Sequence, residues 1–213
     1  MVDFGALADS VIKGNASLTR QLAEQAVAEG VDASKIMSSG LIAGMEVVGR
    51  KFKANEFYLP EVLVAARAMH AGLAVVKPLL EASGAKPAGY VIIGTVKGDL
   101  HDIGKNIVAM MLTGAGFEVE DLGADVPPER FVESAKKRGK CVVGMSALLT
   151  TTMLNMREVI VSLNEAGLAR RVRTIVGGAP VSESFAAEIA AGGYAQDAAT
   201  AVEKVRALLK ELG

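Results

Sequence analysis

From Tyr90 onward the sequence alternates between short β-rich runs and amphipathic helical patterns. This alternation is typical of a parallel sheet with helices packed on both of its faces. It predicts strands at 90–95, 117–121, 141–146, 172–176 and 193–195, separated and followed by helices at 103–114, 128–138, 152–166, 182–191 and 198–211. The length suits the flavodoxin-like strand order 2-1-3-4-5, in which ligands bind at the carboxyl ends of the first and third strands.

Residues before about 83 show helical periodicity only. We expect helices at about 4–13 and 16–29, a third starting near Ser34, and a fourth starting at Pro60. Apolar residues recur in the fourth helix in steps of four and three, which indicates a small bundle: Val62, Ala66, Met69, Leu73 and Val76. Residues 83–89 have the composition of a linker. The predicted fold is therefore a four-helix bundle domain (1–86) followed by a five-stranded, Rossmann-like α/β domain (87–213).

Composition argues against several classes of function. The 213 residues are 51% hydrophobic and carry a net charge of −1, so no overall field attracts nucleic acid. Only 4% are aromatic and Trp is absent, which argues against base stacking. The N-terminal residues lack a signal-peptide pattern, and no uninterrupted apolar run is long enough to span a bilayer. The lone Cys141 is expected to be a buried small hydrophobe, and a single cysteine fits the reducing cytoplasm.

The loop between the first strand and its helix carries the most informative chemistry. His101 is one of only two histidines and follows Asp99 by two residues. An imidazole that a carboxylate orients from behind can ligate a metal, although a histidine at a strand end is more often a hydrogen-bonded bystander. Two further loops, at 146–152 and 177–180, should meet the first at the same sheet edge. Taken singly, their glycines favour ordinary turns and their hydroxyls favour a helix cap. The other histidine, His70, is expected at a polar position of the fourth helix, without a role.

Together these segments resemble the cobalamin-binding domain of methionine synthase and the corrinoid proteins of methyltransferase systems. The resemblance rests on Gly98-Asp99-Leu100-His101-Asp102-Ile103-Gly104, on Ser146, Leu148 and Thr150, on Gly177-Gly178, and on the segment from Tyr194 to Ala198. In the first half, Gly44–Gly49 and Phe57–Val62 resemble the helical cap domain of the same family. The resemblance therefore covers nearly the whole chain.

The resemblance implies a bound cobalamin whose own base is detached from cobalt and replaced by His101. Asp99 would orient the imidazole, and Thr152 would complete a relay in which the family often has serine. The nucleotide tail of the cofactor would enter a slot lined by small or hydroxyl-bearing residues, namely Gly94, Thr95, Ser146, Thr150, Gly177, Gly178 and Ala198. An apolar lid over the upper face would come from the cap; its candidates are Tyr58, Leu59, Val62 and Leu63.

The function that the resemblance implies is that of a methyl carrier, cycling between Co(I) and methyl-Co(III). Its expected partners are a substrate-specific methyltransferase, an acceptor methyltransferase that uses tetrahydrofolate or coenzyme M, and a reductive activator; neither nucleic acid nor a membrane is expected. Alone, such a subunit would bind cofactor but turn over little. Two alternatives stay open at this point: a cobalamin-dependent regulator or light sensor, and the cobalamin subunit of an adenosylcobalamin mutase.

Overall fold

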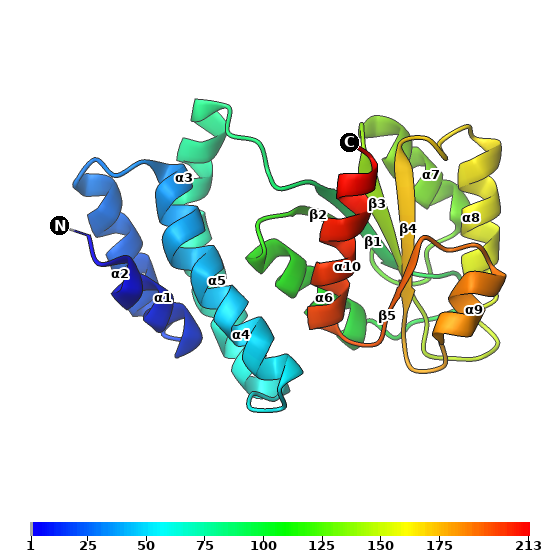
Figure 1. Ribbon diagram of the computed structural model, residues 1–213, viewed down its shortest axis with the longest axis horizontal. Helices are drawn as coiled ribbons and strands as arrows, with labels where there is room; N and C mark the ends of the chain where they lie inside the picture. The colour runs from blue at the N-terminus through cyan, green and yellow to red at the C-terminus, as the bar shows by residue number, and fades with distance from the viewer. Residues whose placement is uncertain (1) are drawn as a thin grey trace. The chain divides into compact units, whose positions relative to one another are not determined.

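The computed structural model describes residues 2–213 and divides the chain into two compact units (Figure 1). The first contains the residues up to Ala88 together with Thr113–Gly116, and the second contains Gly89–Leu112 and Phe117–Gly213. The change of pattern near residue 90 in the sequence thus falls beside a structural boundary.

The first unit is helical throughout. Its elements are α1 (Phe4–Ile12), α2 (Ala16–Ala28), α3 (Ala33–Lys35), the π-helix η1 (Ile36–Ile42), α4 (Ala43–Lys53) and α5 (Leu59–Ser83). Polar side chains cap the first helices as the sequence rules require: Asp3 accepts a hydrogen bond from the Ala6 amide, and Asn15 accepts one from the Leu18 amide. The buried side chains include Leu7, Leu41 and Met69.

The third expected helix contains the π-helical segment η1, which the periodicity did not predict. Ile36, Leu41, Met45 and Val48 are all buried, and the first step between them is five residues. A π-turn places residues five apart on one face, so the wider turn keeps Leu41 in the core. Gly40 lies where a Cβ would be 2.4 Å from Leu7 Cδ2, so α1 packs closely against this segment.

Helix α5 is the one helix within residues 2–213 that is long and apolar enough to cross a membrane, with a mean hydropathy of 1.4 over its most apolar window. Arg67, His70 and Lys77 interrupt the apolar run, as the sequence indicated. Val62, Met69 and other apolar residues of α5 are fully buried, while His70 is exposed. The helix therefore has the two faces of a bundle helix.

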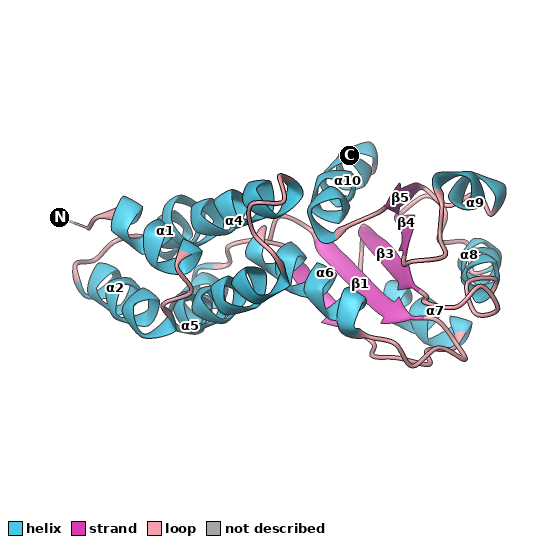
Figure 2. Ribbon diagram, turned by 90° about the horizontal axis from the view of Figure 1, so that it is seen from below, coloured by secondary structure: helices cyan, strands magenta, loops and turns pink. Residues whose placement is uncertain are grey.

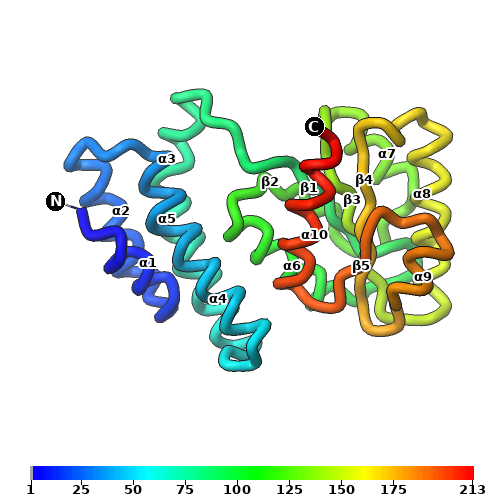
Figure 3. The backbone as a smooth tube through the Cα atoms, in the orientation of Figure 1, coloured from blue at the N-terminus to red at the C-terminus, as the bar shows by residue number. Residues whose placement is uncertain are grey.

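The second unit is a five-stranded, all-parallel sheet in the order β2-β1-β3-β4-β5, which confirms the expected flavodoxin-like order (Figure 2). Its strands are β1 (Tyr90–Thr95), β2 (Glu118–Asp121), β3 (Cys141–Ser146), β4 (Val172–Gly177) and β5 (Gly193–Ala195). Its helices are α6 (Ile103–Gly114), α7 (Pro128–Lys137), α8 (Asn155–Glu165), α9 (Glu183–Glu188) and α10 (Ala198–Glu211). The backbone trace shows the helical crossovers that connect these parallel strands (Figure 3).

The two faces of the sheet differ in the size of their side chains. On the face covered by α7, α8 and α9 lies the main core, which includes Ile92, Phe131 and Met156. On the other face, the last residues of four strands pair in register: Thr95, Ser146, Gly177 and Ala195. A Cβ built on Gly193, which shares this face with Ala195, would lie 3.6 Å from Leu208 of α10. The carboxyl end of the sheet is therefore lined by short side chains on the α10 face.

Candidate functional site

The histidine lies on the loop of residues 96–102, which joins β1 to α6. Gly98 adopts a φ of +81°, a conformation that glycine enters without strain. The Asp99 amide donates to the Val96 carbonyl, and the Thr95 hydroxyl at the end of β1 donates to the carbonyl of His101 at 2.9 Å. The loop is therefore folded back against the strand from which it starts.

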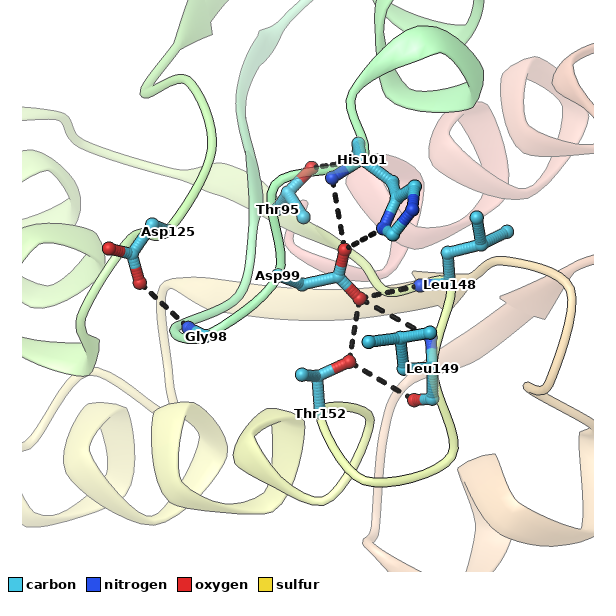
Figure 4. Close-up of polar contacts among 8 residues, drawn as sticks. All are labelled: Thr95, Gly98, Asp99, His101, Asp125, Leu148, Leu149 and Thr152. Carbon is cyan, nitrogen blue, oxygen red and sulfur yellow. Dashed lines mark hydrogen bonds and ion pairs between the residues drawn. The ribbon is translucent and has the colours of Figure 1, made fainter.

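The Asp99 carboxylate joins two loops through five hydrogen bonds (Figure 4). Oδ1 accepts from the His101 amide at 3.0 Å and contacts His101 Nδ1 at 2.8 Å. Oδ2 accepts from the Leu148 and Leu149 amides at 2.8 and 3.3 Å and from the Thr152 hydroxyl at 2.6 Å. The loops that follow β1 and β3, where the winding of the sheet reverses, are thus joined by one side chain.

These contacts determine the charge of Asp99. Its side chain is completely buried, and burial alone would raise its pKa. The hydrogen bonds from Thr152, from the Leu148 amide and from His101 outweigh burial and hold the pKa of Asp99 well below its usual range. Asp99 is consequently an anion that accepts only, so the proton between it and His101 belongs to Nδ1.

The remaining ring nitrogen of His101 is the group that the site offers to a ligand. With Nδ1 as donor, Nε2 carries the lone pair of a neutral imidazole. The His101 side chain is 52% exposed, whereas its Asp99 partner is fully buried. Within residues 2–213 no group of three or more His, Cys, Asp or Glu side chains is arranged to hold a metal. The donor set therefore fits a metal that brings its other ligands with it, as a cobalt held by a corrin ring does.

Exposed apolar side chains lie on both loops and at the start of α6, close in sequence to the residues that form the Asp99–His101 network. Leu100 and Ile103 flank His101 in sequence and are 75% and 71% exposed. Leu148 and Leu149, whose amides bind Asp99, are exposed as well. A flat, largely apolar ligand such as a macrocycle would cover these side chains while Nε2 approached its metal.

The structure brings together many of the site residues that the sequence predicted. Asp99, His101, Thr152, Leu148 and Thr95 are directly connected by hydrogen bonds. Thr152 bears the hydroxyl expected of a relay, and a Cβ built on Gly98 would lie at an ordinary contact distance of 3.6 Å from its methyl group, so the positive φ of Gly98, rather than crowding by Thr152, favours glycine there. Most of the other predicted residues lie at the carboxyl ends of β1, β3 and β4, in the loops that follow them or at the start of α6: Gly98, Leu100, Asp102, Ile103, Gly104, Ser146, Thr150, Gly177 and Gly178. Ala198 follows β5 and begins α10.

One predicted slot residue, Gly94, lies on the opposite face of the sheet, as does Tyr194 of the segment Tyr194–Ala198. Gly94 and Tyr194 share a register row with Met145 and Val176, and a Cβ on Gly94 would lie 2.8 Å from Phe131 Cζ of α7. Gly94 therefore leaves room for Phe131, and Tyr194 packs against the same core. Successive residues of a strand point to opposite faces, so Gly94 cannot share a face with Thr95.

The structure gives a packing role to two other predicted residues, Gly178 of the slot and Val62 of the lid. Gly178 has a φ of +124°, and a Cβ there would lie 1.9 Å from the Ala147 carbonyl oxygen, so the packing of two loops requires glycine. Val62, a candidate for the lid, is completely buried in the helical unit, whereas Tyr58 is 64% exposed and Leu63 is also exposed.

The sequence analysis missed three residues that hold the site. Leu149 donates a second amide to Asp99 from the loop after β3. Asp125 accepts a hydrogen bond from the Gly98 amide at 2.7 Å, and the Asn155 amide group donates to the Lys97 carbonyl at 2.6 Å. These partners are 27 and 58 residues apart in the chain, so no local pattern connects them.

Comparisons with known proteins agree with this geometry. A family model described as a B12 binding domain matches residues 89–203, and a second model with the same description matches residues 4–77. The chain belongs to the B12-binding corrinoid proteins. It is 45% identical over 203 residues to trimethylamine corrinoid protein 1 of Methanosarcina acetivorans, covering 94% of each chain.

Solved structures extend the similarity to the fold of this corrinoid protein. A cobalamin-binding protein from Desulfitobacterium hafniense is 30% identical, with a TM-score of 0.80 over 98% of this chain and 99% of that one. The methanol:cobalamin methyltransferase complex MtaBC of Methanosarcina barkeri contains a chain that is 32% identical, with a TM-score of 0.85 over 97% of this chain and 79% of that one. The expected family, its fold and its corrinoid cofactor are confirmed.

Proposed function

We propose that this corrinoid protein carries a methyl group between two methyltransferases, with His101 Nε2 as the lower axial ligand of cobalt and the cofactor's own base displaced. The observation that carries the proposal is the pairing of a buried, ionised Asp99 with an exposed His101 whose second ring nitrogen points away from that pair. When bound, the corrinoid supplies a cobalt that accepts a methyl group from one partner and gives it to the next.

The chain's own residues would prepare the ligand rather than perform the transfer. Asp99 holds the proton on Nδ1, which fixes the tautomer of His101 and makes Nε2 a better electron donor. Thr152 and the amides of Leu148 and Leu149 keep Asp99 ionised, so it does not take the proton from the imidazole. The strength of the axial bond is thereby set by the protein.

The displaced nucleotide tail would lie against the row of short side chains on the α10 face, formed by Thr95, Ser146, Gly177 and Ala195. The Thr95 hydroxyl already donates to the carbonyl of His101, so Thr95 holds the histidine loop in addition to presenting a short side chain on this face of the sheet.

The partners are proposed from what the relatives of this chain are called. These name trimethylamine and dimethylamine corrinoid proteins, and one neighbouring structure is a methanol:cobalamin methyltransferase complex. A substrate-specific methyltransferase for a methylamine or methanol, an acceptor methyltransferase and a reductive activator would complete the system. We propose that all of them act in the cytoplasm, which fits the single, fully buried thiol of Cys141.

Reconstitution with hydroxocobalamin tests the proposal. The wild-type protein should retain about one cofactor per chain through gel filtration, and its absorbance should be that of an imidazole-ligated corrinoid. His101→Ala should lose that spectrum, whereas His70→Ala, the matched variant of the other histidine, should keep it. Failure of the wild-type protein to retain cofactor, or an unchanged spectrum in His101→Ala, would refute the proposal.

A further inference from the structure

We propose that Asp125 is a positioning residue that holds the histidine loop in the shape required for ligation, acting from a different loop and without touching the imidazole. This inference rests on the proposed function of His101. Asp125 lies between β2 and α7, on the segment Gly123–Val126. Its contacts are to the backbone of the two residues that precede Leu100 and His101.

Asp125 binds the histidine loop at two points. Its Oδ1 accepts from the Gly98 amide at 2.7 Å (Figure 4). Its own amide donates to the Asp99 carbonyl at 2.9 Å. The first contact has a charged acceptor and is short, as expected for a charge-assisted hydrogen bond. Both ends of the Gly98–Asp99 dipeptide are therefore fixed from outside the loop.

The segment that carries Asp125 is itself fastened to β1. The Thr95 amide donates to the Gly123 carbonyl at 2.9 Å, and the Val126 amide donates to the Thr95 carbonyl at 3.0 Å. Val96 and Val126 also form an isolated parallel bridge beyond the end of the two strands. The segment that carries Asp125 is therefore held by the backbone of Thr95 at the end of β1 and of Val96 next to it, and not only by the contacts of Asp125 to Gly98 and Asp99.

The backbone of Asp125 points to the same role. Its φ is +54°, a left-handed conformation that side chains other than glycine enter at a cost and that Asn and Asp tolerate best. Gly123, two residues earlier, also has a positive φ, and no atom lies near the position that its Cβ would take. Glycine therefore occupies the left-handed position of this turn at which no side chain makes a contact. An aspartate at the second left-handed position supplies an acceptor that glycine cannot.

The effect on the metal ligand follows from the geometry. Gly98 can adopt many backbone conformations, so without its partner the dipeptide would gain freedom next to Asp99. Asp99 orients the imidazole through the 2.8 Å contact between Oδ1 and His101 Nδ1. A more mobile Asp99 backbone would therefore make the position of His101 Nε2 more variable. Asp125 thus lowers the cost of ordering the ligand when the metal binds.

Two substitutions separate the acceptor from the backbone conformation. Asp125→Gly accepts the left-handed φ without strain but removes the oxygen, whereas Asp125→Asn tolerates the same φ and keeps an oxygen acceptor. In protein reconstituted with hydroxocobalamin, the equilibrium constant for imidazole ligation should fall about threefold to tenfold in Asp125→Gly, the change expected for one net hydrogen bond. An acid titration of the ligated spectrum should then show a midpoint raised by about half to one pH unit. Asp125→Asn should stay close to the wild type.

The apoprotein offers a readout that does not depend on cofactor. Nitrogen-15 NMR of the two histidines should show His101 as the Nδ1–H tautomer in the wild type, with a mixed population in Asp125→Gly, while His70 serves as the unchanged internal reference. Equal ligation and tautomer populations in the wild type and Asp125→Gly, or equal losses in both variants, would overturn the role of Asp125. Absence of an imidazole-ligated spectrum in the wild type would instead overturn the proposed function, and the two failures are therefore distinguishable.

Discussion

Replacing Thr152 by valine removes one hydrogen bond to a buried anion and changes little else. The two side chains have nearly the same shape, and Thr152 is buried, so the packing of its methyl group is kept. The valine loses the hydroxyl, which contacts Asp99 Oδ2 at 2.6 Å and the Leu149 carbonyl at 3.1 Å; the hydroxyl has one proton, and the shorter contact to the charged oxygen is the one that matters. A hydrogen bond to a charged group contributes about 1.5–3 kcal/mol to stability. Four other donors remain on Asp99, so we expect a loss of about 2 kcal/mol, within that range.

The same change is expected in the titration of Asp99. A difference of about 2 kcal/mol corresponds to a pKa raised by about 1.5 units, since one unit is about 1.4 kcal/mol. The pKa of Asp99 is held well below its usual range by this and the other hydrogen bonds. The carboxyl of Thr152→Val should therefore still be ionised at pH 7. The variant should lose stability without losing the charge that orients His101.

The assay is urea unfolding of the apoprotein, followed by tyrosine fluorescence. The chain has no Trp and three Tyr, of which Tyr90 and Tyr194 lie in the α/β unit. In a Tyr58→Phe background the signal therefore reports that unit alone. Thr152→Ser is the matched control, because it keeps the hydroxyl and loses a methyl group that contributes about 0.8 kcal/mol. A Thr152→Val variant as stable as the serine variant would contradict the argument.

Three further outcomes are expected. Because the pKa of Asp99 is depressed in the folded state, its contribution to stability is present above the unfolded-state pKa of about 4 and is lost as the pH falls toward the folded-state pKa. The difference in unfolding free energy between the wild type and Asp99→Asn should therefore narrow below about pH 4, and a difference independent of pH would contradict this. Gly94→Ala should destabilise the α/β unit by about 1–3 kcal/mol in urea unfolding, because the new Cβ would press on Phe131. Phe131→Leu should restore part of that loss, and equal losses from Gly94→Ala with Phe131 and with Leu at that position would show that the contact is not the cause. Lys105 is buried and donates to both Asp121 and Asn106, while Asp121 is partly exposed. Asp121→Ala should leave a buried cation without a counter-charge and cost about 3 kcal/mol, more than Lys105→Met in the same assay; the opposite order would refute the reasoning.

The order of the sheet could be predicted from the sequence because short β-rich runs, most clearly β1 and β3, alternate with connections that are long enough for a helix. The start of α8 could not. Helical periodicity suggested residue 152, but the helix begins at Asn155. Residues 149–154 form turns that aim the Thr152 hydroxyl and the Leu149 amide at Asp99. The demands of the site override local helical propensity at this point.

Part of the candidate site could also be predicted from the sequence. The pair Asp99 and His101 lies within three residues, so its hydrogen bond is a local event that a motif can reveal. The contacts of Asp125 and Asn155 are long-range and leave no such pattern. The opposite orientations of Gly94 and Thr95 were available from strand alternation alone, yet a shared smallness suggested a shared role. Register, rather than residue type, assigns each small residue to a face.

Asp99 has two functions that its own substitution cannot separate. One oxygen orients the imidazole, and the other joins the loop after β1 to the loop after β3. Any change at Asp99 therefore disturbs both the tautomer of His101 and the distance between the two loops. Thr152 acts on the second oxygen alone, through a hydroxyl that valine lacks. Because Asp99 stays ionised in Thr152→Val, imidazole ligation as strong as in the wild type would show that His101 depends on the charge of Asp99 and not on its hydrogen bond to Thr152, whereas weaker ligation would show that this hydrogen bond is itself required.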